Sequence, residues 1–387
     1  MSSVSTVYIH WPYCISKCRY CDFYSIPCAR DIDHTRWLTQ YKAVLSRMYT
    51  LYHNDKITSI YFGGGTPSLL PTWFVGEIVD HVHQLFEHTA NAEITLEANP
   101  LTISAHEARV LKSYGVNRIS IGVQSLIDMD LTMLGRTHNS AQAIRCVREM
   151  SEIFENISID MIYNRPHQTT TEWAAELDEA LNLPIMHTSL YELIVEEKTE
   201  LGELIRTGEL SPPSDSPEFF ERTIEVAAKN GFEMYEVSSF AKHEQYHCHH
   251  NQSYWKYEDY YGVGPGAHSR LTKGGNKVAI AQVANIDEWL LWSEDPHFNE
   301  EMLSNEDEYK ERLIMGLRAR TGIDLHAIDE RISTRYGLKN KLEKLLKNDY
   351  AVSDGECVIL TQTGVSRLNL IVRYLTNRVA HESSNQQ

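Results

Sequence analysis

The sequence lacks several features that would assign it to common classes of protein. None of its 387 residues lies in an apolar run of about 18 or more, so we expect no membrane-spanning helix. Its start, MSSVSTVYIHW, has no basic segment followed by an apolar one, so we expect a cytoplasmic location, with peripheral attachment to a membrane as the alternative. Basic residues number 36 against 53 acidic ones, a net charge of −17, and nucleic acid is therefore an unexpected partner.

Cysteine is scarce as well, and its placement is uneven. Seven cysteines are an odd number, and a chain without an export signal does not use them for a disulfide framework. Three of them, Cys14, Cys18 and Cys21, stand close together in YIHWPYCISKCRYCDFYS. We therefore expect metal binding or catalysis at this stretch rather than disulfide bonds.

Short apolar segments alternate with stretches of helical periodicity along most of the chain. The apolar segments begin at residues 7, 59, 93, 118, 156 and 187, and AQAIRCVREMSEIF and TTEWAAELDEAL are examples of the helical stretches between them. Alternation of this kind predicts parallel β/α units. The six units predict an α/β fold with an open (β/α)6 partial barrel.

Polar residues recur in phase within three of the predicted strands. Glu97, Gln124 and Asp160 each alternate with apolar residues and lie near the C-terminal ends of their strands, where β/α barrels carry their sites. Any one of them could be a satisfied buried polar residue. Three in phase on neighbouring strands favour a site inside the barrel.

The pattern changes after residue 270, which predicts two domains, 1–270 and 271–387. TKGGNK, at 272–277, is a candidate boundary loop. Three helical stretches follow, then a hairpin with Asp354 and Gly355 at its turn, then a last helix. This order predicts a small α+β domain of winged-helix type.

The spacing CxxxCxxC suits an iron–sulfur cluster. Three thiolates on a short loop can each bind one iron of a cubane 4Fe-4S cluster, which leaves the fourth iron open. A zinc site is the alternative, but it normally uses CxxC pairs and needs a fourth ligand. Cys28, His10 or His34 could supply that ligand.

The same stretch resembles the radical S-adenosylmethionine (SAM) enzymes, because CxxxCxxC carries an aromatic residue, Tyr20, before the third cysteine. The resemblance implies that Cys14, Cys18 and Cys21 hold a 4Fe-4S cluster whose open iron chelates the methionine moiety of SAM. It also implies the open six-unit barrel. Reductive cleavage of SAM would then need an electron donor such as a flavodoxin or ferredoxin.

Further motifs resemble the coproporphyrinogen III dehydrogenase-like branch of that family along nearly all of the chain. They are YIHWPYC, GGGTP, EANP, GVQS, LGRTH and SIDMIY. In GGGTP the glycines would allow the backbone to approach the methionine amino group of SAM. The resemblance implies that SAM is contacted by eight residues: Tyr8, Gly64, Gly65, Thr66, Glu97, Gln124, Arg136 and Asp160.

One motif departs from this branch. The family usually has YGLPGQ where this chain has YNRPHQ at 163–168, so Asn164 and His167 replace glycines and Arg165 adds bulk. This departure does not affect the prediction of a barrel. It implies that the part of the site that binds the substrate differs in shape from that of the family.

The branch contains a dehydrogenase and haem chaperones, and this chain resembles the chaperones more closely. In the dehydrogenase the cluster motif continues as CxxxCxxCxC and an N-terminal extension helps to enclose the substrate, whereas here Asp22 and Phe23 follow Cys21 and 13 residues precede Cys14. HNQSYW, at 250–255, resembles the HNxxYW motif proposed for haem binding, with His250 as the candidate axial ligand.

We expect HNQSYW in a loop that overhangs the barrel mouth or joins the two domains. The usual imidazole pKa, near ~6.5, predicts that haem binding through His250 weakens in mild acid. His268 is the next candidate ligand.

The resemblance implies a chaperone that binds haem and transfers it to acceptor haemoproteins. It leaves open whether SAM cleavage belongs to that function, and therefore whether the protein is an enzyme. The alternative is an oxygen-independent coproporphyrinogen III dehydrogenase, which decarboxylates propionates after hydrogen abstraction by the adenosyl radical. A third class is a zinc-stabilised binding protein.

Overall fold

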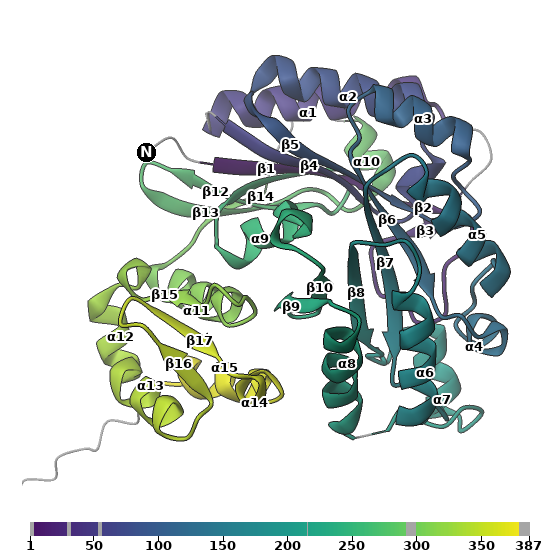
Figure 1. Ribbon diagram of the computed structural model, residues 1–387. Coiled ribbons are helices and arrows are strands. Elements are labelled where there is room, and N and C mark those ends of the chain that lie inside the picture. Colours follow the sequence, from purple (N-terminus) through teal and green to yellow (C-terminus); the bar gives the residue numbers. More distant parts are fainter. Residues whose placement is uncertain (1–3, 29–31, 53–55, 215, 292–298, 379–387) are drawn as a thin grey trace, which may run out of the picture.

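A computed structural model describes residues 4–28, 32–52, 56–214, 216–291 and 299–378 (Figure 1). Its larger part is a twelve-stranded sheet in the order β14-β13-β12-β11-β1-β4-β5-β6-β7-β8-β10-β9. Six of the strands pair in parallel and in sequence order, which confirms the predicted β/α units. They are β1 (Val4–Trp11), β4 (Lys56–Gly64), β5 (Glu87–Ala98), β6 (Arg118–Gln124), β7 (Asn156–Tyr163) and β8 (His187–Glu192).

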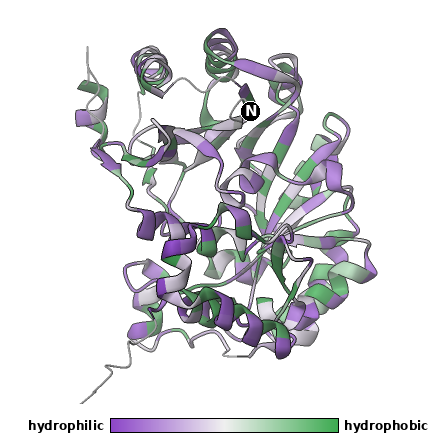
Figure 2. Ribbon diagram, turned by 90° about the vertical axis from the view of Figure 1, so that its left-hand side faces the viewer, coloured by the Kyte–Doolittle hydropathy of each residue, from purple (hydrophilic) through white to green (hydrophobic). Residues whose placement is uncertain are grey.

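Helices cover the outer face of this curved sheet, and the main hydrophobic core lies between the two layers (Figure 1). Three of the helices begin at capping boxes, in which the side chain of the N-cap residue and that of the third helical residue each accept a hydrogen bond from the other residue's backbone N–H. In Figure 2 the helices carry hydrophilic and hydrophobic bands side by side, as expected when one face packs on a sheet. The helices are α1 (His34–Tyr52), α2 (Thr72–Leu85), α3 (Ala105–Ser113), α5 (Ser140–Ser151), α6 (Thr170–Leu181) and α8 (Glu218–Lys229).

The alternation in the strands decides which side chains face the concave side. In β5, Ile94 and Leu96 are buried in the core against the helices. Glu97, which directly follows Leu96, points to the opposite face and lines the cavity there. In β6, Ile119 and Ile121 are fully buried in the same core. The polar residues that the sequence placed in phase therefore share the inner face.

The two edges of the sheet are extended by shorter strands. One edge continues from β8 through β10 (Ser239–Ala241) to β9 (Glu233–Glu236). The other continues from β1 through four strands: β11 (Asp259–Val263), β12 (His268–Lys273), β13 (Asn276–Ala281) and β14 (Asn299–Met302). The remaining helices of the larger part are short: α4 (Asp128–Met133), α7 (Glu200–Arg206), α9 (His249–Trp255) and α10 (Ile286–Leu291).

The boundary expected after residue 270 falls inside β12. TKGGNK forms the turn of the β12–β13 hairpin, with Gly274 and Gly275 both at positive φ. Val278 and Ile280 on β13 pack into the main core, so this hairpin continues the large sheet. A separate core begins at Tyr309, and we therefore propose that the division lies near residue 303.

The smaller part contains the predicted order of helices, hairpin and last helix. Its three-stranded sheet runs β15-β17-β16, and Asp354 accepts hydrogen bonds from two backbone N–H groups in the hairpin turn. Its elements are α11 (Asn305–Gly316), β15 (Ile323–Asp324), α12 (Glu330–Tyr336), α13 (Leu338–Lys347), β16 (Ala351–Ser353), β17 (Cys357–Leu360), α14 (Gln362–Val365) and α15 (Leu368–Thr376). Among the described residues, no helix combines the length and apolar character needed to span a membrane.

Candidate cluster and cofactor site

A cavity of about 680 Å³ lies on the concave side of the sheet. It is walled by residues of the six parallel strands and by the three-cysteine loop. All of the residues proposed for the cluster and for SAM line it, and so does the first haem candidate, His250. These residues are Tyr8, Cys14, Cys18, Cys21, Gly64, Gly65, Thr66, Glu97, Gln124, Arg136, Asp160 and His250.

The three cysteines lie on one loop at one end of this cavity. The loop is closed by the parallel pair β2 (Tyr13–Cys14) and β3 (Ile26–Pro27). Cys14 is buried, Cys18 and Cys21 are half-buried, and the Cys21 N–H donates to the Cys18 carbonyl at 3.1 Å. Cys28 lies outside the cavity lining.

The chemistry of these donors fits a 4Fe-4S cluster. Three soft thiol ligands face one space, and the Arg136 guanidinium donates to Cys18 Sγ at 3.2 Å, which stabilises thiolate charge. Burial raises the pKa of Cys14 and of Cys21, so both thiols are protonated at neutral pH until a metal displaces their protons.

The glycines of GGGTP allow close packing of protein against protein. A side-chain carbon at Gly65 would lie 2.6 Å from the Tyr13 carbonyl oxygen, and one at Gly64, where φ is +111°, would lie 2.7 Å from the His10 ring. The Gly65 N–H donates to the Trp11 carbonyl at 2.6 Å. The glycines thus hold the end of β4 directly against the segment that carries Cys14.

Two carboxyl groups face the cavity from β5 and β7. Glu97 accepts a hydrogen bond from the Tyr61 hydroxyl at 2.8 Å and one from the Gly64 N–H at 3.1 Å. Burial raises the pKa of Glu97 to about 7, and burial likewise raises the pKa of Asp160 to about 6. These acceptors suit hydroxyl groups or a cationic ligand.

Gln124 and Arg136 lie beside each other at the end of β6. Gln124 has a φ of 70°, at an irregularity in the pairing of β6 with β7. Arg136 donates to the Gly122 carbonyl at 2.7 Å and to Cys18 at the same time. The guanidinium therefore connects the end of β6 to the cysteine loop.

HNQSYW forms helix α9, and the expectation of a loop for this segment is wrong. His250 is 2% exposed, and its ring stacks on that of Tyr61, at 4.5 Å, and on that of Tyr8, at 5.6 Å. Tyr254, one helical turn later, meets the same ring edge-on at 4.6 Å. These aromatic contacts fold the polar-looking segment into the barrel interior.

Burial also changes the chemistry expected for His250. It lowers the pKa of the imidazole to about 3, and Nδ1 is buried without a hydrogen-bond partner among the described residues. The ring is therefore neutral through the physiological range and faces the cavity as an available base. His268, in contrast, is exposed and outside the cavity lining.

The sequence analysis missed several residues of the cavity wall, among them Tyr61, Arg118 and Cys248. Tyr61 stands in the same phase as Gly63 on β4, opposite the buried Ile60 and Phe62, and this alternation is a signal that could have found it. Arg118, paired with Glu93 at 3.6 Å, and the buried Cys248 line the inner part of the cavity. The sequence around Arg118 and Cys248 has no pattern that would have predicted a place in the cavity.

Comparisons with known proteins agree with this architecture. Residues 8–180 match the model of the Radical SAM superfamily, and residues 303–366 match that of the HemN C-terminal domain. The structure of coproporphyrinogen III oxidase (HemN) from Escherichia coli has a TM-score of 0.81 and 18% sequence identity, covering 97% of this chain and 91% of that chain. This similarity shows a shared fold.

Two relatives are similar over nearly their whole length. The mitochondrial radical S-adenosyl methionine domain-containing protein 1 of Dictyostelium discoideum is 33% identical, covering 95% of this chain and 93% of that protein. Heme chaperone HemW of Lactococcus lactis is 30% identical, covering 93% of this chain and 94% of that protein. The chain therefore belongs to the radical SAM family that contains Heme chaperone HemW and radical S-adenosyl methionine domain-containing protein 1.

Proposed function

We propose that this protein is a haem chaperone, which binds haem and passes it to acceptor haemoproteins. The observation that carries the proposal is the full-length similarity to relatives named Heme chaperone HemW, from Lactococcus lactis and Buchnera aphidicola among others. The buried, neutral His250 that faces the central cavity supports it.

Membership in the radical SAM family implies a 4Fe-4S cluster and SAM as cofactors. Cys14, Cys18 and Cys21 would each hold one iron, and the cluster would supply an electron for reductive cleavage of SAM. Arg136 stabilises thiolate charge at Cys18, and this contact supports the assignment of the cysteine loop. A flavodoxin or ferredoxin is the proposed electron donor if SAM is cleaved.

The remaining residues of the cavity wall would bind SAM. Glu97 and Asp160 offer carboxylate oxygens to the ribose hydroxyls or to a cationic group. Arg136 offers a guanidinium that suits the SAM carboxylate. Tyr8, Gly64, Gly65, Thr66 and Gln124 would complete this site.

Haem would use His250 as its axial ligand. A neutral imidazole is a common ligand of haem iron, and Tyr8, Tyr61 and Tyr254 surround the ring with aromatic surface that can pack against a macrocycle. The 2% exposure of His250 requires that haem enter through the cavity or displace these rings.

A transfer assay tests the proposal. Anaerobically reconstituted protein, loaded with one equivalent of haem, is mixed with a haem-free b-type cytochrome, and the Soret spectrum of the holo-cytochrome should appear as that of the chaperone disappears. The same sample, given coproporphyrinogen III, SAM and a reductant, should form no protoporphyrinogen IX. Sustained decarboxylation together with failure to transfer haem would contradict the chaperone and favour the dehydrogenase.

A further inference from the structure

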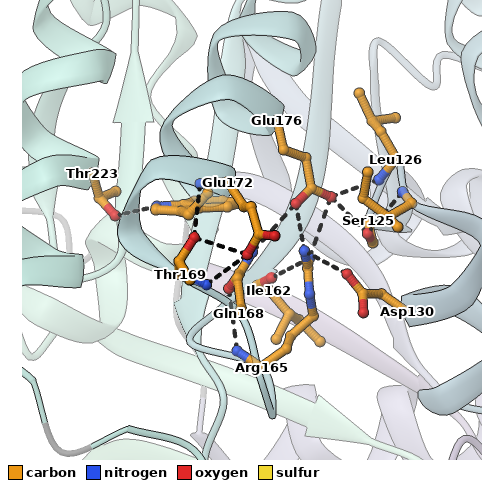
Figure 3. A network of polar contacts seen from close by, with 12 residues as sticks. Ser125, Leu126, Asp130, Ile162, Arg165, Gln168, Thr169, Glu172, Glu176 and Thr223 are labelled. Atoms are coloured by element: carbon orange, nitrogen blue, oxygen red, sulfur yellow. Dashed lines mark hydrogen bonds and ion pairs between the residues drawn. The ribbon is translucent and has the colours of Figure 1, made fainter.

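A buried network of charges lies behind the proposed SAM site, centred on Arg165 in the loop between β7 and α6 (Figure 3). Its guanidinium is 1% exposed and forms ion pairs with Glu176 of α6 and, at 2.9 Å, with Asp130 of α4. It also donates to the Ile162 carbonyl of β7 at 2.8 Å. One side chain therefore joins three elements of the barrel.

The surrounding loop is shaped to hold this guanidinium in place. Asn164 and His167, on either side of Arg165 and Pro166, both have positive φ, at 57° and 66°. The Gln168 side chain accepts from the Arg165 N–H at 3.2 Å and donates to Glu176 at 3.3 Å. Left-handed backbone at two residues other than glycine persists only where the surroundings enforce it.

Glu176 carries the network to the end of β6. Its Oε1 accepts from the Ser125 hydroxyl at 2.6 Å and from the Leu126 N–H at 2.8 Å (Figure 3). These two residues directly follow Gln124, which is itself held at a φ of 70°. Glu176 therefore holds the turn that directs Gln124 into the cavity, from the side of the turn that faces away from the cavity.

Asp130 carries the network to Arg136. It lies in α4, and the chain leaves that helix through Leu134, whose N–H donates to the Asp130 carbonyl at 2.8 Å. The Arg136 N–H then donates to the Leu131 carbonyl at 2.8 Å. The position of the Arg136 guanidinium against Cys18 therefore depends on where α4 is anchored.

We infer that Arg165 and Glu176 are positioning residues for the cofactor site, which hold Gln124 and Arg136 in register with the cysteine loop. This inference rests on the proposed SAM site. Neither side chain lines the cavity, so both act through Ser125, Leu126 and α4. Two carboxylates converge on one buried guanidinium, so loss of the Glu176 charge would loosen the contact between α6 and the end of β6, and loss of the Asp130 charge would loosen the anchor of α4.

The test compares two Glu→Gln variants of the same helix. Glu176→Gln removes the charge at the centre of the network, and Glu179→Gln is the matched control, because Glu179 is exposed on α6. SAM affinity, measured by isothermal titration on the anaerobically reconstituted protein, should fall about tenfold in Glu176→Gln and stay unchanged in Glu179→Gln. SAM affinity should also fall about tenfold in Arg165→Lys, because lysine keeps the positive charge but lacks the planar guanidinium that pairs with two carboxylates.

A spectroscopic measurement separates positioning from simple loss of stability. Iron and sulfide content, and the EPR spectrum of the reduced cluster without SAM, should match the wild type in Glu176→Gln. The SAM-induced change in that spectrum should appear at about tenfold higher SAM concentration. Wild-type SAM affinity in Glu176→Gln, with or without a lower melting temperature, would overturn the inference.

A milder variant decides the question if Glu176→Gln does not fold. Ser125→Ala removes one hydrogen bond to Glu176 without unpairing a charge, and it should weaken SAM binding about threefold. Unchanged affinity in Ser125→Ala would then overturn the inference. Failure of the wild type itself to bind SAM would instead refute the proposed SAM site.

Discussion

The imidazole of His250 stacks on the phenol ring of Tyr61, with centroids 4.5 Å apart and planes inclined by 20°. The Tyr61 hydroxyl in turn donates to Glu97 at 2.8 Å. The proposed haem ligand is therefore separated from a proposed SAM residue by a single aromatic ring. Both face a cavity of about 680 Å³, a size typical of a site for one small molecule.

Haem and SAM should consequently compete. We expect saturating SAM to weaken haem binding about tenfold, and haem to weaken SAM binding by the same factor, because coupling between two ligands is reciprocal. Haem titrations followed at the Soret band, with and without SAM, measure the effect. In His250→Ala, haem should no longer change SAM affinity, and independent binding in the wild type would contradict a shared cavity.

Haem binding should be insensitive to mild acid. Burial lowers the pKa of His250 to about 3, so the imidazole stays neutral between pH 6 and pH 8 and remains able to bind iron. The sequence alone predicted weakening near the usual imidazole pKa, and the buried position reverses that prediction. Haem dissociation constants measured at pH 6 and pH 8 should agree within about twofold, whereas a loss centred near ~6.5 would indicate a solvent-exposed ligand.

SAM binding should depend on pH through Glu97. Burial raises the pKa of this carboxyl group to about 7 in the unliganded protein, so it is largely protonated at pH 6 and ionised at pH 8. The ionised form attracts the positive sulfonium of SAM, and affinity should therefore rise about tenfold from pH 6 to pH 8. Glu97→Gln should bind weakly with a flatter pH profile. A wild-type profile as flat as that of the variant would remove Glu97 from the site.

The cluster should depend on three cysteines of the seven. Cys14→Ala, Cys18→Ala and Cys21→Ala should each abolish 4Fe-4S assembly, as measured by iron and sulfide analysis after anaerobic reconstitution. Alanine variants of three cysteines outside the loop are the controls and should keep the cluster: Cys28, Cys248 and Cys357. Loss of metal in Cys28→Ala would point to a four-cysteine or zinc site.

Local periodicity was enough to predict the barrel. Residues such as Ile119, Ile121 and Ile159 alternate with polar residues because one face of each strand meets helices and the other meets the cavity. The parallel pairing of these strands followed from the alternation of strand and helix. The in-phase polar residues Glu97 and Asp160 were located for the same reason.

The segments that were predicted poorly depend on distant partners. HNQSYW is polar in composition, and contacts with residues far away in the sequence, such as the rings of Tyr8 and Tyr61, explain why it packs as a helix with His250 buried. The hairpin at 272–277 resembles a linker because its turn is rich in glycine, yet Val278 and Ile280 join the core of the large sheet. The composition of a short segment predicts neither the contacts of HNQSYW with distant rings nor the packing of this hairpin on the large sheet.

The most direct test of the account is a haem titration of the cluster-loaded protein and of His250→Ala. The account predicts saturable binding of one haem per chain in the wild type, with a Soret band characteristic of histidine ligation, and loss of that band in the variant although its cluster content is unchanged. Binding with the same spectrum and affinity in both proteins would contradict the assignment of His250, and absence of saturable binding in the wild type would contradict the haem chaperone itself.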